Sequence, residues 1–206
     1  MGHCRPGAVL GSGVVGANAA SVALGMGVHV LLVAKRLERA RYLTQILHGN
    51  LETVASTPES VAEAVRNADL VIGAVLIPGG LAPKVVTREM VRSIRPGSVI
   101  VDVSVDQGGC VETSRPTTHS NPVFSADRVI HYCVANIPGS VPRTATEALC
   151  NATLPYISKI AESGVAEAMR QDPVRAKGLN THEREVTHEA LARDLGLPVK
   201  TFPSQS

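Results

Sequence analysis

The sequence predicts an α/β fold, a doubly wound parallel sheet of about six strands wrapped by helices, and three observations support this. Short apolar runs alternate with longer segments of helical period over residues 1–136. The runs are apolar throughout, as in parallel strands whose two faces are both covered. A glycine-rich turn separates the first run from the first helical segment. Residues 137–206 read as helices and loops without a strand, so the chain divides into two segments at residue 136.

The expected elements follow one another in the order of such a sheet. Strands are expected in the runs AVL, HVLLV, LETVA, DLVIGAVL, SVIVDVSVD and RVIHYCVAN, and helices at 14–25, 37–48, 58–67 and 87–94. Thr57, Pro58 and Glu59 form the pattern of an N-cap, a first-turn proline and an acid that complements the helix dipole. Helix ends are expected near three glycines, Gly25, Gly49 and Gly97.

One further helix is expected in the second segment, at about 144–163. It carries a stripe of apolar side chains that is larger than a lone terminal helix usually shows, and such a stripe requires a partner surface. The stripe consists of Ala145, Leu149, Leu154, Ile157 and Ile160.

Composition excludes several classes of protein. The 206 residues are 44% hydrophobic and 18% charged with a net charge of +2, which is typical of a soluble globular chain and lacks the basic excess of a nucleic-acid binder. No apolar run reaches the roughly 18 residues of a membrane span, and no secretory signal is recognised. No cluster of residues has metal-ligand spacing, so no metal is expected. The four cysteines form no C-x-x-C pair, and we expect them to be reduced thiols in a cytoplasm. The cysteines are Cys4, Cys110, Cys133 and Cys150.

The glycine-rich turn has the pattern G-S-G-V-V-G, formed by Gly11, Gly13 and Gly16 with Val14 between them. The first glycine permits a tight turn, the second lets backbone N–H groups approach a pyrophosphate, and the third lets helix and strand pack closely. Because the turn follows a strand and opens a helix, it predicts a Rossmann-type dinucleotide site. The alternative is a turn kept only for packing.

The end of the second strand departs from the usual NAD pattern. Ala34 occupies the position where NAD-specific folds place an acid that accepts hydrogen bonds from the ribose, and Lys35 and Arg36 follow it. An alanine removes the repulsion that excludes a 2′-phosphate, and the two cations are suited to pair with one. The local chemistry therefore favours NADP or a weakened preference for NAD. Alternatively, the two cations are solvated residues that open the next helix.

Ligands of open α/β sheets bind outside the carboxyl ends of the strands, and three such ends carry polar residues. Asp106 precedes a flexible Gln-Gly-Gly and is a candidate to orient a water or an amino group, or else a loop-capping residue. Asn136 is a candidate to bind the carboxamide or the substrate, or else a turn residue. His131 is more commonly a packed core residue than an acid or base, and Asp102 is read as structural.

Four strings in this sequence closely resemble alanine dehydrogenases, over about residues 8–198: DLVIGAVLIPGGLAPKVVTREMV, GSVIVDVSVDQGGCVETSRPTTHSNP, YCVANIPGSVPRTATEALCNATLPY and AKGLNTHE. The transhydrogenase nucleotide-binding subunit is a more distant relative. The resemblance implies NAD-dependent oxidative deamination of L-alanine to pyruvate and ammonia, the reverse amination, and a homo-oligomer, commonly a hexamer.

The resemblance also implies site residues. Asp106 would be the catalytic carboxylate that holds water or ammonia at the reacting carbon, while the protein positions the cofactor for hydride transfer. It and its neighbours Val103, Ser104 and Val105 would face the nicotinamide ribose. The rest of the dinucleotide site would be lined by Arg39, Ser56, Val75, Leu76, Val134, Ala135, Asn136 and Ile137.

Two departures from the family pattern affect these expectations. The family has an acid at the position of Ala34, so NADP stays possible beside NAD. The family's amino-terminal half, which supplies an arginine, a lysine and a histidine to the substrate, is missing, and neither Lys84 nor Arg143 has the pattern of a carboxylate clamp.

We therefore expect the carboxy-terminal portion of an alanine dehydrogenase, from a truncated gene, a broken reading frame or a partial record. Its segment 137–206 would belong to an incomplete substrate domain that needs a separate amino-terminal domain. The alternative is a stand-alone dinucleotide-binding module without catalysis.

Overall fold

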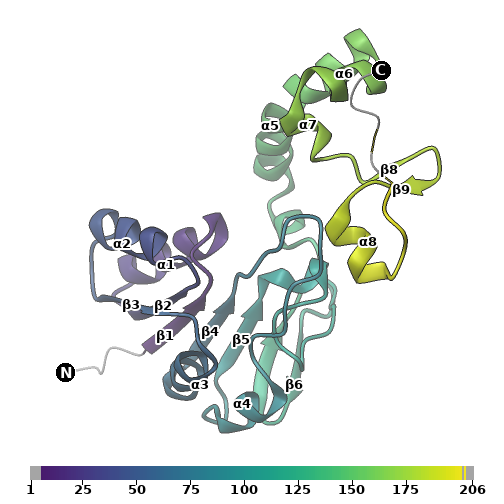
Figure 1. Cartoon of the computed structure of the whole chain (residues 1–206). Helices are drawn as coiled ribbons and strands as arrows, with labels where there is room; N and C mark the ends of the chain where they lie inside the picture. Colours follow the sequence, from purple (N-terminus) through teal and green to yellow (C-terminus); the bar gives the residue numbers. More distant parts are fainter. Residues whose placement is uncertain (1–5, 201, 203–206) are drawn as a thin grey trace. The chain divides into compact units, whose positions relative to one another are not determined.

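The computed structural model describes residues 6–200 and 202, so Cys4 lies outside the described residues. The described residues form two compact units (Figure 1). Unit 1 comprises residues 6–77 and 81–137, and unit 2 comprises residues 78–80 together with 138–200 and 202.

Unit 1 is a seven-stranded sheet in the order β3-β2-β1-β4-β5-β7-β6. All neighbouring strands are parallel except β6 and β7. This arrangement confirms the predicted α/β, doubly wound fold. The strands are β1 (Pro6–Leu10), β2 (His29–Ala34), β3 (Leu51–Ala55), β4 (Leu70–Gly73), β5 (Val99–Asp102), β6 (Val123–Ala126) and β7 (Val129–Tyr132).

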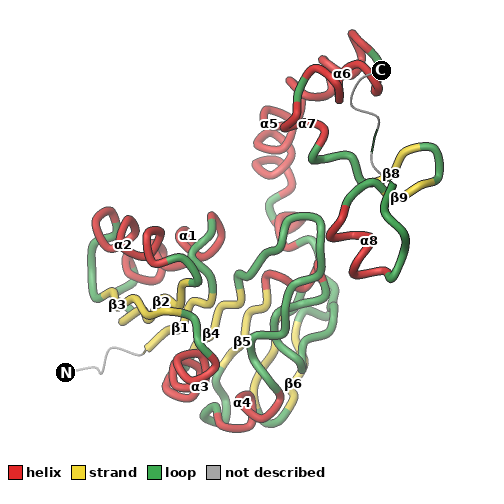
Figure 2. The backbone as a smooth tube through the Cα atoms, in the orientation of Figure 1, coloured by secondary structure: helices red, strands yellow, loops and turns green. Residues whose placement is uncertain are grey.

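Four helices cover the two faces of this sheet, α1 and α2 on one face and α3 and α4 on the other (Figure 2). They are α1 (Val14–Gly25), α2 (Leu37–Ile46), α3 (Pro58–Asn67) and α4 (Arg88–Ser93), close to the predicted ranges. At the start of α3, the Thr57 side chain accepts from the Ser60 N–H at 3.1 Å, which confirms the predicted N-cap.

The apolar strands are explained by one cluster of buried residues on each face. Val9, Val30 and Leu32 pack against Ala20 and Leu24 of α1 and Leu43 of α2. On the other face, strand residues such as Leu10 and Val71 pack against Val65 of α3 and Val91 of α4. Because neighbouring positions of one strand enter different clusters, the strands have no polar face.

Unit 1 differs locally from the sequence prediction, and β4 and β7 end at Gly73 and Tyr132, before the ends of the expected runs. The strand β6 is not among the six expected, and it joins β7 through a turn at Asp127 and Arg128, whose φ angles are 49° and 67°. The expected strand SVIVDVSVD is too long, because β5 ends at Asp102 and the 3₁₀ helix η1 (Val103–Gln107) follows. The Asp102 carboxylate accepts from the Ser104 N–H at 3.1 Å and caps that helix.

Unit 2 contains mainly helices: α5 (Pro142–Ser163), α6 (Val165–Gln171), α7 (Pro173–Ala176) and α8 (Glu189–Leu195). The 3₁₀ helix η2 (Ile137–Ser140) precedes α5. The expectation that this segment has no strand is wrong, because β8 (Thr181–His182) and β9 (Glu185–Val186) form a short antiparallel hairpin. The predicted helix at 144–163 is confirmed as α5. None of its residues is buried, and Leu149 and Ile157 are 64% and 59% exposed.

His131 is a core residue of β7 and not a free acid or base. Its side chain is fully buried, and its ring stacks on Phe124 with centroids 4.9 Å apart. The Nδ1 atom lies 3.0 Å from the Val129 carbonyl, which only accepts, so Nδ1 carries the proton and Nε2 accepts from the Thr113 hydroxyl at 2.7 Å. Burial lowers the pKa of His131 below its ordinary value and keeps the ring neutral.

The buried histidine predicts a loss of stability in acid. Because the pKa of His131 is lower in the folded state, the unfolded chain binds the extra proton first as the pH falls, and the free energy of unfolding decreases. We expect urea unfolding at about pH 7.5 and about pH 5.5 to show this loss, up to about 1.4 kcal/mol per pH unit for one proton. The variant His131→Gln should show a smaller loss over the same range. An equal pH dependence in the two proteins would contradict the prediction.

Candidate dinucleotide site

Two glycines of the loop after β1 are required by the fold itself. Gly11 has a φ of 112°, and a Cβ atom on it would lie 2.3 Å from the Ala74 carbonyl oxygen. A Cβ on Gly16 would lie 1.9 Å from the Gly11 carbonyl oxygen. Both distances are far below van der Waals contact, so any side chain at either position would displace backbone. The packing alternative therefore accounts for Gly11 and Gly16.

Gly13 is different, because a Cβ atom placed on it meets nothing within 4 Å. Gly13 is the N-cap of α1 and has no side chain that could cap the helix. The first hydrogen bond of the helix runs from the Ala17 N–H to the Gly13 carbonyl at 2.9 Å. The preceding N–H groups, from Val14 to Gly16, have no partner within the helix. The loop thus presents backbone donors and the positive end of α1 to open space, which fits a pyrophosphate.

The carboxyl ends of β2 and β3 lie next to this loop. The Gly11 N–H donates to the Val33 carbonyl at 2.9 Å, and the Ser56 N–H donates to the Ala34 carbonyl at 3.0 Å. From α2, the Arg39 Nε–H donates to the Ser12 carbonyl at 3.1 Å. The structure therefore brings Ala34, Arg39 and Ser56 to the same edge of the sheet as the glycine loop.

On the other side of the loop, the ends of β4 and β5 are joined by hydrogen bonds between Val75 and Ser104. The Val75 N–H donates to the Ser104 Oγ at 3.0 Å, and the Ser104 hydroxyl donates to the Val75 carbonyl at 2.8 Å. Leu76, the next residue, is 60% exposed. The predicted residues Val103–Asp106 all lie in η1, directly after β5.

Asp102 holds the loop after β5 in place, as expected of the structural residue that the sequence predicts. Its buried carboxylate accepts from the N–H groups of Ser104, Cys110 and Val111 at 2.9–3.2 Å. Burial, with the Asp102 charge added, raises the pKa of the Cys110 thiol to about 12. That thiol therefore stays protonated and is no nucleophile.

Asp106 is joined to the end of β7 by a backbone hydrogen bond. The Asn136 N–H lies 3.1 Å from Oδ1 and 3.2 Å from Oδ2 of this exposed carboxylate. Asn136 has a left-handed backbone, with a φ of 54°. The His119 Nε2–H donates to the Asn136 carbonyl at 3.1 Å. No sequence signal predicts this contact, since His119 reads as a solvated loop residue.

Neither Lys84 nor Arg143 forms a carboxylate clamp. The Lys84 ammonium donates to the carbonyls of Gly108 and Gly109, the latter at 2.9 Å, and so contacts the loop after η1. In unit 2, the Arg143 side chain is 93% exposed and pairs with Glu147 at 3.6 Å, one helical turn along. Among the described residues no group of acids, histidines and cysteines has the geometry of a metal site.

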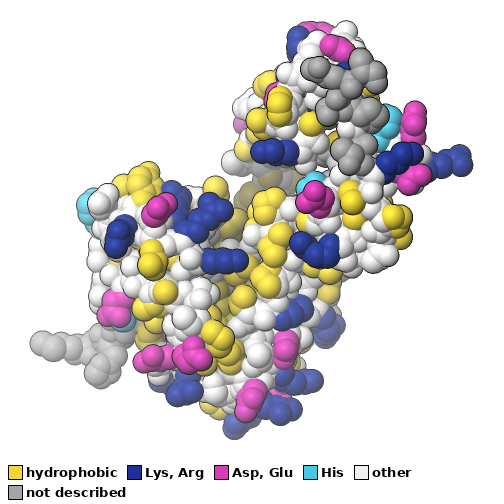
Figure 3. Space-filling model, in the orientation of Figure 1, with side chains coloured by type: hydrophobic (Ala, Val, Ile, Leu, Met, Phe, Trp, Pro, Cys, Tyr) yellow, Lys and Arg dark blue, Asp and Glu magenta, His cyan; other side chains and the backbone are white. Residues whose placement is uncertain are grey.

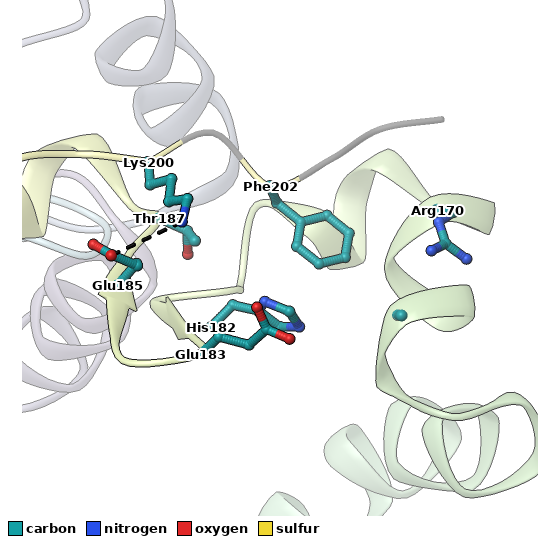
Figure 4. A pocket seen from close by; sticks show the side chains of 8 residues that line it. Arg170, His182, Glu183, Glu185, Thr187, Lys200 and Phe202 are labelled. Atoms are coloured by element: carbon teal, nitrogen blue, oxygen red, sulfur yellow. Dashed lines mark ion pairs between the residues drawn. The ribbon is translucent and has the colours of Figure 1, made fainter. Parts of the chain in front are cut away.

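A separate hollow of about 350 Å³ lies within unit 2 (Figure 4). It shares no residue with the predicted dinucleotide site. Lys200 pairs with Glu185 at 3.9 Å on its wall, and the rings of His182 and Phe202 meet edge to face with centroids 5.0 Å apart. The full lining is Ala166, Arg170, His182, Glu183, Glu185, Thr187, Lys200 and Phe202.

Comparison with known proteins confirms the resemblance read from the sequence. Residues 4–189 match the family model described as alanine dehydrogenase/PNT, C-terminal domain. An alanine dehydrogenase of Halomonas elongata is 51% identical over 189 residues, which cover 92% of this chain and 51% of that protein.

Solved structures agree with the sequence comparison. An L-alanine dehydrogenase aligns with a TM-score of 0.78 and 45% identity, over 93% of this chain and 53% of its own. A transhydrogenase from Sinorhizobium meliloti aligns with a TM-score of 0.69 and 26% identity, over 90% of this chain and 50% of its own. The chain thus spans about half the length of the relatives that it matches. No helix in the described part of the chain is long and apolar enough to cross a membrane.

Proposed function

The chain belongs to the alanine dehydrogenase/PNT family, and from this premise we propose that it is the dinucleotide-binding half of an alanine dehydrogenase. The proposed reaction is the reversible, NAD-dependent oxidative deamination of L-alanine to pyruvate and ammonia. When bound, the nicotinamide would supply hydride transfer, and the residues of this chain named below would hold it and the substrate in place.

The observation that carries the proposal is the open space at Gly13. The fold requires Gly11 and Gly16, but nothing in the described protein excludes a side chain at Gly13. A glycine there is useful to a ligand whose phosphate groups approach the backbone closely. Arg39 and Ser56 flank this position on one side, and Val75 with η1 flanks it on the other, which supports a dinucleotide laid across the strand ends.

Asp106 is the proposed catalytic carboxylate. It is exposed and accepts a hydrogen bond from the Asn136 N–H, which fixes the carboxylate at the carboxyl ends of β5 and β7. A carboxylate in that position would accept a hydrogen bond from water or ammonia and so direct the lone pair of that molecule at the reacting carbon. Val134–Ile137 and Val103–Val105 are the proposed contacts with the nicotinamide and its ribose.

The substrate clamp is proposed to come from another domain. Lys84 and Arg143 have other partners, and α5 leaves Leu149, Leu154 and Ile157 exposed. This apolar surface supports docking of an amino-terminal substrate domain or self-association into the family's oligomer, with segment 137–206 proposed as part of the substrate domain. Cys110, Cys133 and Cys150 are free thiols, which supports a cytoplasmic location. The second candidate function is a dinucleotide-binding module without turnover.

The proposal is tested by a fluorescence titration of the purified chain with NADH, followed by an L-alanine oxidation assay on the same sample. We expect NADH binding without turnover by the chain alone, and turnover once an amino-terminal substrate domain is added. Binding with no turnover in either case would favour the module. Absence of NADH and NADPH binding would refute the dinucleotide site.

A further inference from the structure

The segment between β2 and α2 carries a concentrated positive charge. Residues 35–42 contain four cations and one acid, Glu38. Figure 3 shows dark blue cationic side chains gathered over the α2 end of unit 1. Among the residues that the structure describes, none of the four forms an ion pair. The four cations are Lys35, Arg36, Arg39 and Arg41.

The strand order places this segment on the adenosine side of the proposed dinucleotide site. In the order β3-β2-β1-β4-β5-β7, the glycine loop after β1 lies between the ends of β2 and β3 and the ends of β5 and β7. Asp106 and Asn136 lie at the β5 and β7 ends, where the nicotinamide is proposed. With the pyrophosphate at the glycine loop, the other half of the ligand covers the ends of β2 and β3.

The end of β2 offers no acceptor for an unmodified ribose. Ala34 is its last residue and is fully buried, so a methyl group stands where a carboxylate is needed to accept from the 2′-hydroxyl. Lys35 and Arg36 follow directly and are exposed. Ser56 lies beside them, because its N–H donates to the Ala34 carbonyl at 3.0 Å, and it is exposed as well.

Arg39 already has a position at the phosphate loop. Its Nε–H donates to the Ser12 carbonyl, and its guanidinium lies over the Tyr42 ring, 4.9 Å from the centroid. The side chains of Lys35 and Arg36 make no hydrogen bond or ion pair within the described part of the chain, so both are available to an anion. The acids nearest in sequence to Lys35 and Arg36 are Glu38, in the first turn of α2, and Glu52, in β3.

We propose that Lys35, Arg36 and Ser56 form a subsite for the 2′-phosphate of an adenosine dinucleotide, so that the chain binds NADPH at least as tightly as NADH. The proposal rests on the dinucleotide site proposed above and specifies its ligand. In this subsite the phosphate accepts two parallel hydrogen bonds from the Arg36 guanidinium, a charge-assisted hydrogen bond from the Lys35 ammonium and a hydrogen bond from the Ser56 hydroxyl.

The test is a pair of fluorescence titrations of the full chain, with NADH and with NADPH. We expect the dissociation constant for NADPH to be equal to or below that for NADH. The double variant Lys35→Ala/Arg36→Ala should weaken NADPH binding by about tenfold or more and change NADH binding much less. Ala34→Asp should reverse the preference, since its carboxylate repels the phosphate and accepts from the 2′-hydroxyl. If Ala34→Asp does not fold, the double variant alone carries the test.

Arg66→Ala is the matched control, because Arg66 is exposed in the last turn of α3, at the opposite edge of the sheet. It should leave both dissociation constants unchanged. NADH binding about tenfold tighter than NADPH binding, or an equal loss for both ligands in the double variant, would overturn the subsite. Failure of both ligands to bind would instead refute the dinucleotide site itself.

Discussion

Replacing Gly16 by alanine is expected to abolish dinucleotide binding and to lower the free energy of unfolding by about 3 kcal/mol. The added Cβ would lie 1.9 Å from the Gly11 carbonyl oxygen. Because neither atom can move without its backbone, helix α1 and the loop must move apart. That movement displaces the N–H groups that are proposed to hold the pyrophosphate. Urea unfolding followed by circular dichroism measures the first effect, and NADH fluorescence measures the second.

Two other glycines separate the effects of fold and ligand. A Cβ atom on Gly25, at the end of the same helix, would meet nothing within 4 Å, so Gly25→Ala should keep NADH binding and unfold at the same or a slightly higher urea concentration. Gly13→Ala should keep near-native stability and weaken NADH binding by about tenfold or more. If Gly13→Ala bound NADH as tightly as the unmodified chain, the loop would not be the pyrophosphate site.

Some elements of this fold are predictable from the sequence and others are not. The doubly wound sheet was predictable because strands buried on both faces are largely apolar, and the start of α3 was recognisable from Thr57. The strand β6 was not, since its turn at Asp127 and Arg128 lacks the usual Asn-Gly signal. Asp127 of that turn instead pairs with residues remote in sequence, Arg88 at 3.0 Å and Arg92 at 3.3 Å.

The candidate site divides in the same way. The glycine loop and the position of Ala34 follow from local spacing, so both are found from the sequence. The hydrogen bond between Asp106 and Asn136 joins residues thirty positions apart. His119 reaches that residue from a third segment. No local pattern encodes such contacts, and the catalytic role of Asp106 stays a prediction.

Asp102→Asn is expected to destabilise unit 1 by about 3 kcal/mol, the second large effect. Each carboxylate oxygen has its own donors: Oδ1 accepts from the Ser104 N–H at 3.1 Å, and Oδ2 accepts from those of Cys110 and Val111 at 2.9 and 3.2 Å. In either orientation of its side-chain amide, an asparagine would place its NH₂ donor against the N–H donor of Ser104 or against those of Cys110 and Val111. Because the site is fully buried, water does not replace the lost acceptor.

Asp106→Asn is the matched control, since the exposed Asp106 carboxylate accepts from one backbone N–H, that of Asn136. The free energy of unfolding of Asp106→Asn should stay within about 1 kcal/mol of that of the unmodified chain. Alkylation of Cys110 gives a second, local readout, because its buried thiol reacts only when the loop after η1 opens. We expect mass spectrometry to find faster labelling of Cys110 in Asp102→Asn than in Asp106→Asn. Equal stability and equal labelling in the two variants would mean that Asp102 does not hold this loop, and the geometry of η1 would need another cause.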